Sequence, residues 1–87
     1  MIWTLKKISE DDKVINIGYS YEDNYSCDGL IVYDKKTDTM KLVKVSPVPG
    51  ENDGFAKFVG EKAFYFARGL LNENKLTEKP YTVVTGW

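Results

Sequence analysis

Apolar and polar residues alternate most regularly in the segment Val14–Tyr21. One face of this segment carries Ile15, Ile17 and Tyr19, and the other carries small or polar residues. A period of two is typical of a strand with one buried face. The apolar segment Ile2–Ile8 precedes it, and a short polar run separates the two. We therefore expect these segments to form an antiparallel hairpin.

Two further strands are predicted after the polar loop Glu22–Asp28. Leu30–Tyr33 is apolar on both faces, which favours a central position in a sheet. Asp34–Asp38 reads as a tight turn, because aspartate side chains can accept hydrogen bonds from nearby backbone N–H groups. Met40–Val45 then returns along the sheet. The short connections predict a meander of antiparallel strands.

A long helix is predicted after Ser46–Gly50, a segment in which Pro47 and Pro49 lack the N–H that a strand ladder needs. Asn52 or Asp53 can cap its N-terminus. At 100° per residue, one arc of about 180° is apolar over roughly 18 residues. This arc contains Phe55, Ala56, Val59, Gly60, Ala63, Phe64, Phe66, Ala67, Leu70 and Leu71.

Three residues stand out within this helical pattern. Gly60 lies on the apolar arc, where a missing side chain would let a strand approach closely. Gly69 lies on the polar arc, where it can mark an early end of the helix. Phe58 is the single phenylalanine among the polar positions. Each glycine costs a helix about 1 kcal/mol relative to alanine.

The last apolar segment, Tyr81–Trp87, is rich in strand-forming residues, and we expect it to pair into the sheet. The predicted fold is therefore α+β, with a bent antiparallel sheet of four to five strands packed on one long helix in the order β-β-β-β-α-β. Five strands make a sheet about 24 Å wide, whereas one helix covers about 10–12 Å. Either the sheet curls around the helix or a second copy covers the remainder, and we favour a homodimer.

Composition places the chain among small globular proteins. Its 87 residues allow one domain, spanning residues 1–87, and 43% of them are hydrophobic. No apolar run is long enough for a membrane span, and residues 1–20 carry charges in place of the apolar core of an export signal. Cys27 is the one cysteine, which fits a reducing cytoplasm. We therefore expect a cytoplasmic protein without a membrane partner.

The charge distribution is uneven although the net charge is −1. Residues 1–34 have a balance of −4, and residues 35–87 have a balance of +3. The basic excess begins around one predicted hairpin, which also carries an aromatic residue. The candidate interaction surface that this pattern indicates consists of Tyr33, Lys35, Lys36, Lys41 and Lys44. The acidic total makes nucleic acid an improbable partner, because phosphate contacts require a basic surface.

Motifs for catalysis or cofactor binding are missing from the sequence. The absence of histidine excludes a catalytic triad and histidine-based metal sites. Cys27 lies beside acidic residues, which do not favour a nucleophilic thiolate, and Glu22–Asp28 lacks the ligand spacing of a calcium loop. The sequence at residues 50–54 is acidic, which favours a helix cap over a phosphate site. We therefore predict no enzyme activity, no cofactor and no metal.

The chain is unusually rich in tyrosine, with six residues, and it also has two tryptophans. Both residue types are frequent in strands and in protein contact sites. The sequence therefore favours a non-enzymatic protein-interaction or regulatory module with an unidentified protein partner. The alternatives are a small nucleic-acid-binding module that uses the Lys35–Lys44 hairpin and a small-molecule-binding domain.

Overall fold

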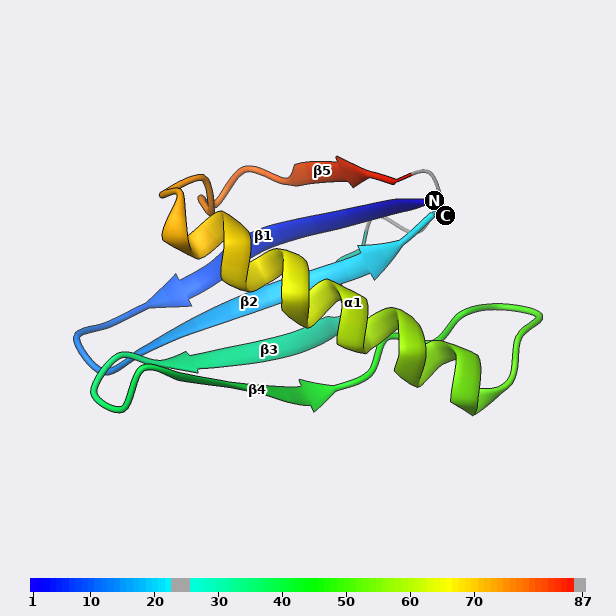
Figure 1. Ribbon diagram of the computed structural model, residues 1–87, viewed down its shortest axis with the longest axis horizontal. Helices are drawn as coiled ribbons and strands as arrows, with labels where there is room; N and C mark the ends of the chain where they lie inside the picture. The colour runs from blue at the N-terminus through cyan, green and yellow to red at the C-terminus, as the bar shows by residue number, and fades with distance from the viewer. Residues whose placement is uncertain (23–25, 86–87) are drawn as a thin grey trace.

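Five strands form one antiparallel sheet in the order β4-β3-β2-β1-β5, and a single helix lies diagonally across one face (Figure 1). The computed structural model describes residues 1–22 and 26–85. The elements are β1 (Ile2–Glu10), β2 (Val14–Tyr21), β3 (Gly29–Asp34), β4 (Thr39–Lys44), α1 (Asp53–Asn72) and β5 (Tyr81–Val84). The predicted α+β fold, its meander and its element order are confirmed.

Aspartate side chains close two of the tight turns in the meander. Between β1 and β2, Asp11 Oδ1 accepts hydrogen bonds from the N–H groups of Lys13 at 2.7 Å and Val14 at 2.8 Å. Between β3 and β4, Asp34 Oδ1 accepts from the backbone N–H of Lys36 at 2.9 Å. These bonds satisfy the turn backbone locally, as predicted for Asp34–Asp38 but not for Asp11. They fix short connections and hence the antiparallel pairing of successive strands.

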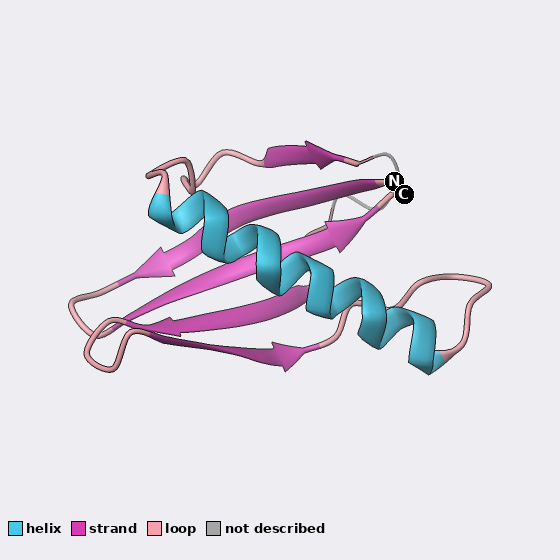
Figure 2. Cartoon of the chain, in the orientation of Figure 1, coloured by secondary structure: helices cyan, strands magenta, loops and turns pink. Residues whose placement is uncertain are grey.

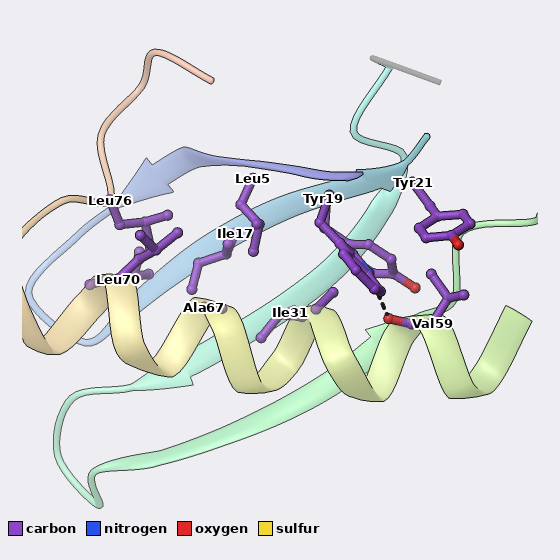
Figure 3. Packing of buried hydrophobic residues seen from close by; sticks show 12 residues of the cluster. Leu5, Ile17, Tyr19, Tyr21, Ile31, Val59, Ala67, Leu70 and Leu76 are labelled. Carbon is purple, nitrogen blue, oxygen red and sulfur yellow. Dashed lines mark hydrogen bonds between the residues drawn. The ribbon is translucent and has the colours of Figure 1, made fainter. Parts of the chain in front are cut away.

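The core lies between the helix and one face of the sheet (Figure 3). Alternate residues of each central strand face the helix, so the period of two in the sequence is confirmed. The fully buried members from the sheet are Trp3, Leu5, Ile17, Tyr19 and Ile31. Small residues on α1, chiefly Ala63 and Ala67, allow the helix backbone to lie close to these side chains.

The helix begins and ends close to where the apolar arc predicts. Asn52 is the N-cap, and its Oδ1 accepts a hydrogen bond from the Phe55 N–H at 2.8 Å. The helix has 20 residues and continues past Gly69 to Asn72, so the early end considered at Gly69 is wrong. Packing of Leu70 into the core holds the last turn despite the glycine. The close approach predicted at Gly60 is confirmed, because a Cβ there would lie 2.7 Å from the Tyr19 hydroxyl.

The face of the sheet opposite the helix is partly covered by the chain between β2 and β3. Cys27 is buried there, with its Sγ 3.8 Å from Ser20 Oγ and 3.9 Å from the Thr4 carbonyl. Gly18 makes room for this segment, since a Cβ at that position would lie 2.8 Å from the Cys27 carbonyl oxygen. Residues 23–25 of the predicted loop lie outside the described residues. Cys27 is thus a packing residue on this face.

The predicted C-terminal strand is present as β5, which pairs with β1 and forms one edge of the sheet (Figure 2). Its predicted extension through Gly86 and Trp87 lies outside the described residues. The strand therefore continues the sheet from the side of β1, at the edge opposite β4. Within residues 1–22 and 26–85 there is no helix with the length and apolar character that crossing a membrane requires.

Candidate interaction surface

Tyr33, the aromatic member of the surface predicted from sequence, lies on the helix side of β3 and is held in a local cluster. Its hydroxyl donates to Asp38 Oδ1 at 2.7 Å. The guanidinium of Arg68 donates to both oxygens of Asp38, at 3.0 and 3.2 Å, and lies 5.7 Å from the centre of the Tyr33 ring. The hydrogen bond to the Asp38 carboxylate raises the pKa of Tyr33. Tyr33 thus helps to tie the β3–β4 turn to α1.

The four lysines of that surface lie in different surroundings. Lys35 forms an ion pair with Glu10 at 2.6 Å and donates to the carbonyl of Asp11, so it binds the neighbouring hairpin. Lys36 is exposed in the β3–β4 turn. Lys41 is paired with Val32 and Lys44 with Leu30, a register that places both on the side of the sheet away from α1. The structure therefore does not bring all five residues onto one face, and their role in binding stays a prediction.

The ion pairs of Glu10 give the fold a pH dependence that can be measured. Hydrogen bonds from Lys35 and Lys7 lower the pKa of Glu10 from 4.5 to about 2. A lowered carboxylate pKa stabilises the fold above about pH 4.5, and this contribution is lost as the pH falls toward about 2. We expect Glu10→Gln to reduce the loss of stability between pH 5 and pH 2, measured by urea unfolding at each pH. The difference between wild type and variant should shrink in high salt, because both lysine contacts are accessible to solvent. If the free energy of unfolding falls equally between pH 5 and pH 2 in wild type and in Glu10→Gln at low salt, Glu10 does not have this role.

Aromatic residues extend along one flank of α1 between Phe55 and Phe66. Phe55 packs against Tyr21 with ring centres 6.1 Å apart, and Phe66 packs edge-on against Trp3 at 5.0 Å. Phe58 stacks beside Phe55 and is 44% exposed. Two turns later, Tyr65 lies beside Phe66 and is 74% exposed. We call Phe55, Phe58, Tyr65 and Phe66 the aromatic flank of α1.

A groove runs between the C-terminal half of this flank and the edge strand β5. Its volume is about 380 Å³. Tyr65 of α1 lines one side and β5 lines the other, where the side chain of Val84, which pairs with Ile2, points away from α1. The remaining lining residues are Phe66, Gly69, Leu70, Glu73, Lys75, Tyr81, Thr82 and Val83. We call this feature the α1–β5 groove.

The charges at the end of the groove are paired with each other. Lys75 Nζ lies 2.8 Å from Glu73 Oε2, and this contact raises the pKa of Lys75. The groove lining therefore carries no unpaired net charge, and its other side chains are apolar, aromatic or hydroxyl-bearing. Such a lining suits apolar side chains of a partner better than an anion or a cation.

A second groove of about 560 Å³ lies at the opposite edge, between the end of β4 and the first turns of α1. Leu42, Val45 and Pro47 line its apolar part, but Asp53, Lys57 and Glu61 also line it. It lacks an exposed aromatic side chain, and charged residues are depleted in the centres of protein contact sites. The α1–β5 groove is therefore the stronger candidate.

Sequence reasoning missed the α1–β5 groove. It placed Phe58 among the polar positions of the helix, and the structure shows that Phe58 and Tyr65 are both exposed. A signal was present in their spacing of seven residues, which places the two aromatics two turns apart on one flank of a helix. Gly69 follows on the same flank, one turn after Tyr65. What the pattern could not show is that β5 lies next to this flank.

No protein-family model, no curated protein and no solved structure matches this chain. In the described part of the chain, no three His, Cys, Asp or Glu side chains are grouped so that they could hold a metal ion. The function is therefore inferred from the exposed aromatic flank and the α1–β5 groove.

Proposed function

We propose that the chain is a non-enzymatic protein-interaction module whose contact site is the α1–β5 groove. The observation that carries this proposal is the exposure of the aromatic side chains of Phe58 and Tyr65 along one flank of α1, with Tyr65 beside a groove whose other wall is β5. Large apolar side chains that are exposed together mark contact sites more often than scattered ones do. Tyrosine is enriched among residues that contribute most to binding, because it is large, rigid and amphipathic.

Gly69 supports this proposal because it lowers the stability of the helix without being needed for internal packing. A helical glycine costs about 1 kcal/mol relative to alanine. Apart from the two chain neighbours of Gly69 and the nearby helix backbone, no atom lies within 4 Å of where its Cβ would be. Packing within the described chain therefore does not require a glycine here. Its missing side chain leaves the groove open beside Phe66 and Leu70. An incoming side chain explains a glycine that internal packing does not.

Truncation of Tyr65 is expected to weaken partner binding strongly and leave the fold intact. Tyr65 is exposed, so Tyr65→Ala should change stability by no more than about 0.5 kcal/mol. As a central contact residue it should weaken binding by at least about 2 kcal/mol, roughly 30-fold. The measurement is quantitative affinity capture from the native host with full-length bait, followed by calorimetry with each purified candidate partner.

Lys57→Ala is the matched control, because Lys57 is an exposed residue of the same helix that lines the other groove. It should retain every partner of the wild type with unchanged affinity. A partner that binds Tyr65→Ala as tightly as wild type would show that the α1–β5 groove is not the contact site. Failure to capture any partner with wild-type bait would count against the interaction role itself.

A further inference from the structure

The two edges of the sheet differ in their protection against pairing with another strand. β4 carries Lys41 and Lys44, and its register with β3 is interrupted by an irregularity between Leu30 and Ile31. Charged residues and bulges are the usual devices that keep an edge strand from pairing. The sequence of β5, Tyr81–Val84, has no charge, and its pairing with β1 is regular. β5 is therefore the edge that can accept a strand.

Hydrogen bonding to β1 determines which groups of β5 point outward. Met1 and Thr85 exchange both of their backbone bonds, with the Thr85 N–H donating to the Met1 carbonyl at 2.9 Å and the Met1 amine donating to the Thr85 carbonyl at 3.2 Å. Bonded and non-bonded pairs alternate along an antiparallel ladder. Tyr81 and Val83 therefore bond to β1, and the N–H and C=O groups of Thr82 and Val84 point away from the sheet. No further strand lies beyond β5 in the described part of the chain.

We propose that β5 pairs antiparallel with β5 of a second copy, about a two-fold axis at Val83. This inference rests on the proposed function and identifies the first partner as the chain itself. With Val83 on the axis, Thr82 of one protomer faces Val84 of its partner, and each of these residues uses both its N–H and its C=O. A register centred on Thr82 would instead place Val84 opposite Pro80, which has no N–H. The register at Val83 thus satisfies all the outward groups of Thr82 and Val84.

The absence of charge in β5 makes identical strands compatible. Antiparallel pairing about a two-fold axis brings equivalent residues together, and like charges directly opposite each other are destabilising. Tyr81–Val84 contains no such charge, whereas β4 would bring lysines together. Pairing through β5 also joins the two α1–β5 grooves across the new strand pair, with the two α1 helices on the same face of one continuous sheet.

The first test measures the solution mass of the full chain by sedimentation over a concentration series. The wild type is expected at twice 9.9 kDa. Thr82→Pro removes an outward N–H and no bond to β1, so it should halve this mass while the circular dichroism spectrum stays native. Val83→Pro is the matched variant, because it removes an N–H that bonds to β1 and should unfold the edge strand.

The second test fixes the register by disulfide formation. Opposed residues of a non-bonded antiparallel pair have Cα atoms about 4.5 Å apart, within the range that a disulfide spans. Val83→Cys should therefore give a covalent dimer under mild oxidation. Thr82→Cys should not, because its two copies are separated by roughly 8–9 Å in this register. The native Cys27 is buried, so wild type should stay uncrosslinked.

Three results would overturn the proposal. A wild-type mass of 9.9 kDa throughout the series would show that the chain does not self-associate. A dimer that persists in Thr82→Pro would place the interface elsewhere, and a dimer that crosslinks through Thr82→Cys but not through Val83→Cys would show another register. A monomer whose partner is lost on Tyr65→Ala would refute the dimer and support the interaction role, so the two proposals can fail separately.

Discussion

Replacing Trp3 by alanine is expected to lower the free energy of unfolding by about 4 kcal/mol, a large part of the total for a domain of this size. Trp3 is fully buried, and its indole N–H donates to the Val59 carbonyl of α1 at 3.1 Å. Its ring meets Tyr21 and Phe66 edge-on, each with ring centres 5.0 Å apart. One side chain of β1 thus joins β2 to the helix, and its removal leaves a cavity at their junction.

Urea unfolding followed by circular dichroism measures this loss, and two variants separate its causes. Trp3→Phe keeps most of the ring but removes the N–H, so it should cost about 1–2 kcal/mol. Lys57→Ala, on the exposed side of α1, should cost no more than about 0.5 kcal/mol. A loss below about 1 kcal/mol for Trp3→Ala would contradict the packing of α1 on β1.

Local patterns were sufficient to predict the elements of this fold. Val14–Tyr21 alternates with a period of two, and the structure has β2 at these residues. The apolar arc places Val59, Ala63 and Ala67 together, and these residues are buried against the sheet. Such periodicities arise from the geometry of one strand or one helix, so a single sequence contains them.

Contacts between distant segments could not be predicted in the same way. Arg68 of α1 binds Asp38 in the β3–β4 turn, thirty residues earlier. Leu76 reaches the core from the polar segment after α1, and Cys27 packs on the far side of the sheet. None of these residues has a local pattern that identifies its partner, because each contact depends on how the elements cross.

The candidate site was missed for the same reason. The sequence predicted a contact surface of Tyr33 and the lysines of its hairpin because these residues are close together along the chain. The structure places Tyr33 beside α1 and pairs Lys35 with Glu10. The α1–β5 groove instead combines Tyr65 and Val83, which line one groove only because β5 pairs with β1.

A single methyl group added at Gly29 is expected to lower the free energy of unfolding by about 3 kcal/mol, near the upper end of the usual range for overpacking. Gly29 is opposite Tyr19 in the β2–β3 ladder, and a Cβ there would overlap the Tyr19 ring. This ring cannot move away easily. It is fully buried, Gly60 of α1 lies against its hydroxyl, and that hydroxyl accepts a hydrogen bond from the Ser46 N–H at 2.9 Å.

Gly69→Ala is expected to change the free energy of unfolding in the opposite direction to Gly29→Ala. Its Cβ would contact nothing within 4 Å, so alanine should raise the free energy of unfolding by about 1 kcal/mol through helix propensity. Urea unfolding of both variants should thus give a loss at Gly29 and a gain at Gly69. A neutral Gly29→Ala would mean that Tyr19 is not confined between β3 and α1. A loss at Gly69 would mean that its missing side chain serves internal packing, which would remove one support for the α1–β5 groove as a contact site.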